Sequence, residues 1–80
     1  MKKLEHEAEL VIEALRIGEI YARKRGVGKF EATDSAKNKI TYLYRLLVHD
    51  KLIQPLHPDQ VSQKAIRHRL AVWASKLSDP

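Results

Sequence analysis

Residues 3–26 read KLEHEAELVIEALRIGEIYARKRG, and this stretch decides the fold class. Apolar and small residues recur in it at spacings of three and four, which is the period of an amphipathic helix. Glutamates fill its first half and three basic residues precede Gly26, so the charges match the helix dipole and the glycine supplies a stop. The pattern predicts one long helix over residues 3–25. The apolar side of this helix carries Leu4, Ala8, Val11, Leu15, Gly18 and Ala22.

A second helix is predicted after the glycine-containing turn. Thr33, Asp34 and Ser35 are all residue types that cap helix N-termini well. Apolar residues follow at helical spacing, so the pattern predicts a helix over residues 35–49. This helix is apolar around more than half of its circumference, which indicates that it lies in the core. Its apolar stripe consists of Ala36, Ile40, Leu43 and Leu47.

A third helix is predicted over residues 58–77. Pro58 suits the first turn of a helix, and Asp59 favours the positive end of the helix dipole. Between the second and third helices, residues 51–56 include three aliphatic side chains that must cover something. We therefore expect an ordered connector, extended or with a single turn, packed against the helices. The apolar stripe of the third helix consists of Ile66, Leu70, Trp73 and Leu77.

The chain is short enough to form only one core. It has 80 residues, of which 44% are hydrophobic and 31% are charged, and both fractions are typical of a globular domain. A second folded unit would have too few residues left for a core of its own. The sequence predicts a single all-α domain over residues 1–80, a three-helix bundle with a long N-terminal helix and an ordered extended connector between helices two and three.

Cysteine usage and hydropathy bear on the cellular compartment. The chain has no cysteine, and a small domain without disulfides is typical of a reducing compartment. Glutamates at positions 5, 7, 9 and 13 interrupt the apolar run that a signal peptide needs. No stretch approaches the roughly 20 apolar residues of a membrane span. We expect a cytoplasmic protein that does not enter a membrane.

No pattern in the chain predicts catalysis, a metal site or a cofactor. The histidines are scattered at His6, His49, His57 and His68, whereas zinc usually takes three or four ligands at close spacing. His49, Asp50 and His57 share one segment, but positions at helix ends explain these histidines more simply. The glutamates of the first helix form a solvated row without the apolar wall that general acid–base catalysis requires. We expect no enzyme activity, no bound metal and no cofactor.

Basic residues are unevenly distributed along the chain, which carries a net charge of +5. Residues 1–20 hold three basic and five acidic groups, whereas residues 21–55 hold eight basic and three acidic groups. This asymmetry fits a polyanionic partner and fits a solvated surface equally well. The segment between the second and third helices exceeds the three or four residues of a helix-turn-helix, which argues against a standard recognition helix. Candidate phosphate contacts are Arg23, Lys24, Arg25, Lys29, Lys64, Arg67, His68 and Arg69.

Apolar residues in excess of the needs of one core predict an association surface. Ile12 and Ile20 project toward the charged side of the first helix, and Val61 and Val72 belong to a second stripe on the third helix. Apolar patches of this kind mark protein interfaces, and a homodimer would cover one self-complementary surface. The alternative is that the connectors fold over these residues. Candidate interface residues are Ile12, Ile20, Tyr42, Tyr44, Val61 and Val72.

Together these patterns predict a small helical protein that binds a partner without catalysing a reaction. The predicted function is that of a protein-interaction or adaptor module, which either forms a homodimer or binds another protein. The alternative is a basic nucleic-acid-associated protein that contacts the phosphate backbone.

Overall fold

The computed structural model describes residues 6–28, 30 and 35–78. Within these residues it contains three α-helices, which are α1 (Glu7–Arg25), α3 (Ala36–His49) and α4 (Gln63–Ser78), and one 3₁₀ turn, η1 (Pro58–Gln60). None of the described residues forms a β-strand. The predicted all-α class with three helices is confirmed.

The long first helix ends where its sequence predicts. Gly26 takes the left-handed conformation with φ of 77°, which costs glycine little because it has no Cβ. Its N–H donates to the carbonyl oxygen of Arg23, and the N–H of Val27 donates to that of Ala22. These bonds satisfy carbonyls that the end of α1 would otherwise leave without donors. At the other end, α1 begins at Glu7 with His6 as its N-cap, later than the predicted start at residue 3, and residues 3–5 lie outside the described part.

The second predicted helix is α3, and the structure confirms its position. The Oγ atom of Ser35 accepts a hydrogen bond of 3.1 Å from the N–H of Asn38, so Ser35 is the N-cap. At the other end, the chain turns at Lys51, which adopts a positive φ of 63°. The N–H of Leu52 then donates to the carbonyl oxygen of Leu47 over 2.8 Å, which closes the C-terminus of α3.

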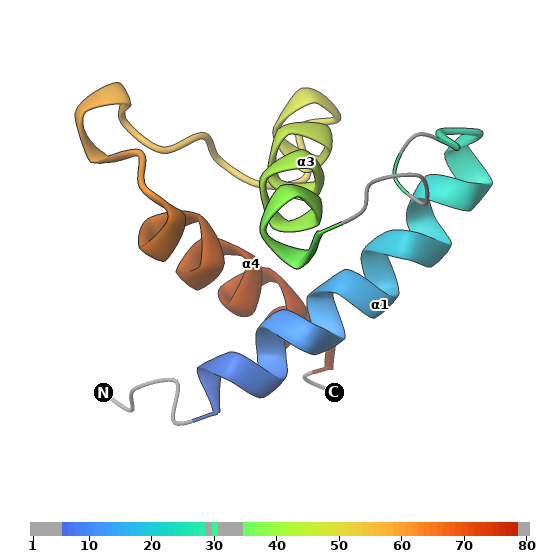
Figure 1. The fold of residues 1–80 in the computed structure, drawn as a ribbon, viewed down its shortest axis with the longest axis horizontal. Helices are drawn as coiled ribbons and strands as arrows, with labels where there is room; N and C mark the ends of the chain where they lie inside the picture. Colours follow the sequence, from blue (N-terminus) through green and yellow to red (C-terminus); the bar gives the residue numbers. More distant parts are fainter. Residues whose placement is uncertain (1–5, 29, 31–34, 79–80) are drawn as a thin grey trace.

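The connector between α3 and α4 is ordered, as predicted. Ile53 and Leu56 are partly buried and pack against the core. The N–H of Leu56 donates to the hydroxyl oxygen of Tyr44 over 2.7 Å, which ties the connector to the middle of α3. The connector runs outward and back in Figure 1, between the end of α3 and the start of α4.

The predicted start of the third helix at residue 58 is wrong. Pro58 begins the short turn η1, after which Val61 is extended, and α4 begins only at Gln63. The Oγ atom of Ser62 accepts a hydrogen bond of 3.1 Å from the N–H of Ala65, so Ser62 caps α4. Pro58 and Ser62 are both residue types that are typical of a helix start. Pro58 begins only the short turn η1, whereas the cap at Ser62 begins the longer helix α4. Val61 therefore belongs to the connector rather than to a stripe on the third helix.

The core lies where the three helices meet. In Figure 1, α1 crosses the molecule diagonally with α4 across its N-terminal half, and α3 lies over both. Gly18 of α1 lies so close to α3 that a Cβ atom there would be 2.6 Å from the Cδ1 atom of Leu43. The largest fully buried side chains are Phe30, Leu43, Leu47 and Leu70. Leu77, which the predicted stripe places in this core, is instead 54% exposed near the end of α4.

Candidate binding groove

A hollow of about 190 Å³ lies between α4 and the segment that follows α3. We call it the α4 groove. Its existence depends on the turn at Lys51, which directs residues 51–54 along the side of α4. Its lining residues are Lys51, Leu52, Ile53, Gln54, Arg69, Val72, Trp73 and Lys76.

One side of the α4 groove is a single face of α4. Arg69, Val72 and Lys76 are separated by three and four residues, so their side chains share one side of the helix. Trp73 lies next to this row, is partly buried, and packs against the core while it also lines the groove. The predicted role of Trp73 as a core residue is therefore incomplete, because part of its ring system borders the hollow.

The opposite side of the α4 groove comes from the start of the connector. Leu52 is 47% exposed although it is a large aliphatic residue, whereas its neighbour Ile53 is partly buried against the core. The connector therefore contributes one anchored and one accessible apolar side chain. Together with Val72 and Trp73, they give the groove a partly apolar surface.

The charge of the α4 groove has a single sign. Lys51, Arg69 and Lys76 line it, and no Asp or Glu is among its described lining residues. None of these three cations forms an ion pair with another described residue. Three unpaired cations next to one another repel, so an anion that enters the groove gains favourable interactions with all of them.

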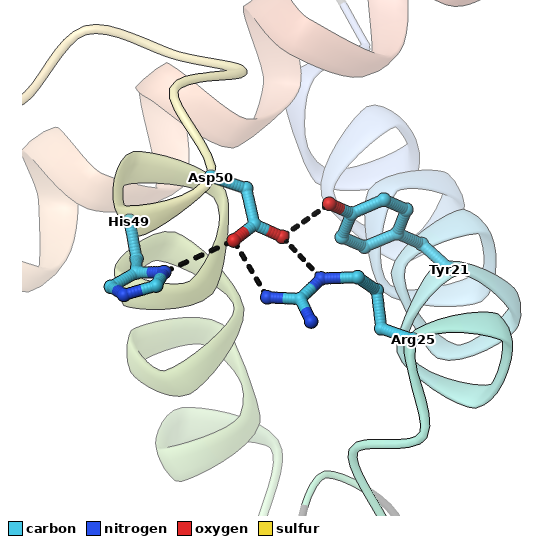
Figure 2. A network of polar contacts seen from close by, with 4 residues as sticks. All are labelled: Tyr21, Arg25, His49 and Asp50. Atoms are coloured by element: carbon cyan, nitrogen blue, oxygen red, sulfur yellow. Dashed lines mark hydrogen bonds and ion pairs between the residues drawn. The ribbon is translucent and has the colours of Figure 1, made fainter.

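Asp50, directly before Lys51, fixes the position of this side of the groove. Its carboxylate accepts two hydrogen bonds of 2.7 Å from the guanidinium of Arg25 and one from the hydroxyl of Tyr21 (Figure 2). His49 Nδ1 lies 3.1 Å from the same carboxylate. The cluster of Tyr21, Arg25, His49 and Asp50, which we call the Asp50 latch, joins the C-terminal ends of α1 and α3.

The latch lowers the pKa of its acid, Asp50, and raises the pKa values of the groups that donate hydrogen bonds to it, Arg25 and Tyr21. The hydrogen bonds from Arg25 and Tyr21 hold the pKa of the Asp50 carboxyl well below its ordinary value of 3.8. The same carboxylate raises the pKa of Arg25, and it raises the pKa of Tyr21 above the ordinary value of 10.0. At neutral pH Asp50 is therefore ionised while Tyr21 keeps its proton, which is the combination that the latch needs.

The structure divides the eight candidate phosphate contacts. The guanidinium of Arg25 donates two hydrogen bonds to the carboxylate of Asp50, so this candidate phosphate contact already has an anionic partner. Arg23 lies 3.3 Å from Glu19, and His68 Nδ1 lies 3.3 Å from Glu7. Lys29 lies outside the described residues, and only Arg69 lines the α4 groove. The three remaining candidates, Lys24, Lys64 and Arg67, are exposed and lie away from the groove.

The structure also divides the six candidate interface residues. Only 9% of Tyr44 is exposed, and its hydroxyl accepts the hydrogen bond that holds the connector. Tyr42 is half-buried, and its ring stacks on Phe30 with centroids 6.1 Å apart. Val72 is half-buried and lines the α4 groove.

Three exposed apolar candidates remain outside the groove. Ile12 is 67% exposed on α1, where Ile20 is also exposed, and Val61 is exposed on the connector. Ile12 and Ile20 point roughly 80° apart around the helix, since each residue turns the chain by about 100°. Ile12 and Ile20 therefore face different directions on α1, and Val61 lies on the connector.

Sequence reasoning missed most residues of the groove. The path of the connector is not predicted by the sequence. Its residues Lys51, Leu52 and Gln54 were therefore not recognised as lining a hollow. The spacing of Arg69, Val72 and Lys76 was a usable signal, because it places a mixed basic and apolar row on one side of the third helix. A basic row alone is typical of a solvated surface, however, and only the connector beside it makes a groove.

The described part of the chain contains neither a cluster of metal ligands nor a membrane-spanning helix. No three His, Cys, Asp or Glu side chains lie together there in a way that could hold a metal ion. No described helix is both long and apolar enough to cross a lipid bilayer. A second hollow of about 340 Å³ lies between α1 and the start of α3, but its lining includes both Glu19 and Lys39 and so has no single sign of charge.

The fold and the groove define a small three-helix protein with a basic and partly apolar surface hollow. The chain belongs to the family described as a domain of unknown function (DUF5062), whose sequence pattern matches residues 3–79. No curated protein and no solved structure matches the chain.

Proposed function

We propose that this protein is a non-catalytic interaction module that binds a partner protein in the α4 groove. The observation that carries the proposal is the composition of that groove. Accessible apolar side chains from Leu52 and Val72 lie among three unpaired cations, with no carboxylate among the described lining residues. This combination favours an anionic partner that also brings apolar surface.

The two kinds of groove residue would serve different steps of binding. Buried apolar anchors supply most of the affinity at protein interfaces, and a few such residues dominate the binding free energy. Charged residues at the edge steer the approach of an oppositely charged partner and exclude partners of the same charge. Trp73 and Leu52 suit the first role, and Lys51, Arg69 and Lys76 suit the second.

The size of the groove supports binding rather than catalysis. Sites for small-molecule substrates usually enclose about 300 Å³ or more, and they surround most of the ligand. The α4 groove has about 190 Å³ and is open to solvent. It has room for a side chain of a partner, and its described lining residues include no histidine, serine, threonine or carboxylate that could act as an acid, a base or a nucleophile.

The cellular setting follows from composition. The absence of cysteine supports a reducing compartment, which we propose is the cytoplasm. A homodimer is one form that the proposed complex could take. Nucleic acid is the alternative partner, because Lys64 and Arg67 extend the basic surface of α4 beyond the groove. The experiment must therefore separate a protein, a second copy and a nucleic acid.

A photoreactive side chain in the groove tests the proposal. Leu52→p-benzoylphenylalanine places the reactive group at the exposed apolar position, and Lys37→p-benzoylphenylalanine serves as a control at the opposite end of α3. Irradiation in the native cells should give an adduct with another protein from position 52 and not from position 37. An adduct at twice the 9.2 kDa chain mass would identify a second copy.

Charge-matched variants complete this test. Lys51→Glu, Arg69→Glu and Lys76→Glu together should abolish the adduct, whereas Lys24→Glu, Lys37→Glu and Lys64→Glu change the net charge equally and should leave it intact. Nuclease treatment should not affect the adduct. Adducts that disappear with nuclease would show nucleic acid as the partner, and equal labelling from positions 52 and 37 would show that the α4 groove binds nothing.

A further inference from the structure

We infer that the segment bound in the α4 groove is acidic and carries one apolar anchor side chain with a carboxylate on either side of it. This inference rests on the proposed function and specifies the chemistry of the partner. It follows from the volume of the groove, the order of charges along α4 and the net charge of the chain.

The volume limits the anchor to one side chain. The hollow of about 190 Å³ is well below the roughly 300 Å³ at which pockets for whole small molecules begin. Leu52, Val72 and Trp73 provide the apolar surface around it. A leucine or phenylalanine side chain of a partner would lose its contact with water there, and burial of such a side chain stabilises a complex.

The order of charges along α4 places the carboxylates. Arg69 and Lys76 lie seven residues apart, which is about 10 Å along the helix axis, and Val72 and Trp73 lie between them. A side chain anchored at Val72 and Trp73 therefore has one cation before it and one after it. In an extended peptide, residues two positions apart point the same way and are roughly 7 Å apart. Acidic residues two positions before and after the anchor would reach Arg69 and Lys76 through their flexible side chains.

Lys51 strengthens the preference for an acidic segment from the other side of the groove. It belongs to the connector rather than to α4, and its backbone is held by the turn that the Asp50 latch fixes. A bound acidic segment would therefore meet cations on both walls. Basic residues in a segment would be repelled by the cations on both walls. The groove therefore discriminates against basic segments as well as attracting acidic ones.

A partner of different chemistry fits these features less well. A second copy of this chain carries the same net charge of +5, so its approach is opposed at low salt. Single-stranded nucleic acid binds best where several aromatic side chains form a stacking platform. Trp73 is the only aromatic residue that lines the α4 groove in the described part of the chain, and it is partly buried. The observations therefore favour an acidic peptide segment.

Trp73 makes the test direct, because it is the only tryptophan of the chain and lies at the site. The probe is a short synthetic peptide with one leucine and a glutamate two positions before and after it, titrated at low salt. We expect a saturable change in the fluorescence of Trp73. Replacing the leucine by serine should weaken binding about tenfold, which corresponds to about 1.4 kcal/mol. Replacing both glutamates by lysine should abolish binding.

Two protein variants assign the peptide to the groove. Arg69→Glu should weaken binding of the acidic peptide at least tenfold, and Lys64→Glu, with the same charge change on another side of α4, should change it less than twofold. Both residues are on the surface of a helix, and circular dichroism checks that both variants fold. The unliganded fluorescence of Trp73 should be similar in both.

Several results would overturn the inference. Equal affinity for the leucine and serine peptides would show that no apolar anchor contributes to binding. Equal weakening of binding by Arg69→Glu and Lys64→Glu would show that only the net charge of the protein matters. Tighter binding of an oligo-deoxythymidine than of the peptide would make nucleic acid the ligand. Absence of peptide binding together with a protein adduct from position 52 would overturn the acidic anchor motif and leave the proposed function standing, whereas absence of both would overturn the two together.

Discussion

The carboxylate of Asp50 joins two helix ends that are far apart in the sequence. It receives hydrogen bonds from Arg25 and Tyr21 of α1 and lies at the C-terminus of α3. Bidentate pairs of arginine with carboxylate are among the stronger polar interactions, and the geometry here is of that type. Because Lys51 follows Asp50 directly, this one side chain bears on both the stability of the fold and the shape of the α4 groove.

Asp50→Asn should lower the stability of the protein, and the size of the loss should depend on pH. The pKa of Asp50 is held below 3.8 in the folded state, so ionised Asp50 contributes stability at pH values above 3.8, and this contribution is lost as the pH falls through the lower pKa. The variant has no such carboxylate. The difference between the urea midpoints of the wild type and the variant should be largest near pH 7 and should shrink steadily below pH 3.8.

Asp59→Asn is the matched control for this measurement. The side chain of Asp59 is 90% exposed on η1. Its replacement should leave the urea midpoint nearly unchanged both near pH 7 and below pH 3.8. An equal loss of stability in the two variants, or a loss in Asp50→Asn that does not vary with pH, would show that the latch does not act through its charge.

The hydroxyl of Tyr44 is a second residue whose role can be isolated. It accepts the hydrogen bond from the N–H of Leu56, which no other described group accepts. Tyr44→Phe should lower the free energy of unfolding by about 1 kcal/mol, because the partly buried N–H loses its partner. Tyr42→Phe is the control, since the hydroxyl of Tyr42 makes no hydrogen bond to a described residue. Equal midpoints for the two variants in urea denaturation would contradict this role.

At the scale of elements, helix α4 begins later than its sequence first indicates, and its cap can be tested. The Oγ atom of Ser62 accepts from the N–H of Ala65, one of the donors that a helix N-terminus leaves free. Ser62→Ala should therefore cost about 1 kcal/mol of stability, as is typical for loss of an N-cap, and Ser62→Asp should restore most of it. Thermal unfolding followed by circular dichroism measures both.

Ser75→Ala provides the comparison within α4. Ser75 lies in the interior of the helix, where alanine has the better helix propensity, so this substitution should be neutral or slightly stabilising. If Ser62→Ala behaved in the same way, the helix would instead begin at the turn that contains Pro58.

At the scale of the whole molecule, the net charge of +5 should govern how fast an anionic partner arrives. Raising the salt concentration from about 0.1 M to about 1 M shortens the screening length from about 10 Å to about 3 Å. We expect the association rate constant of the acidic peptide to fall about tenfold over this range, with a smaller change in the dissociation rate constant. Stopped-flow fluorescence of Trp73 measures both constants. A change confined to dissociation would show that steering by net charge is unimportant.

Much of the fold follows from short-range patterns. The C-terminus of α1 and the N-terminus of α3 are predicted because Gly26 and Ser35 each form hydrogen bonds within the adjoining helical turn. The start of α4 is missed because Pro58 and Ser62 both satisfy local rules for a helix start. The contact between the hydroxyl of Tyr44 and the connector is not predicted, because the wide apolar surface of α3 gives no sign of which side the connector covers.

The all-α class, the presence of three helices and the basic excess could therefore be predicted from the sequence, because each depends on neighbours along the chain or on composition alone. The candidate site could not, because it depends on contacts between segments that are far apart in the chain. Lys51 and Arg69 belong to different segments, and they line one hollow because the Asp50 latch and the bond from Leu56 to Tyr44 fix the path of the connector. Such long-range contacts depend on the packing of the helices, which periodicity does not encode.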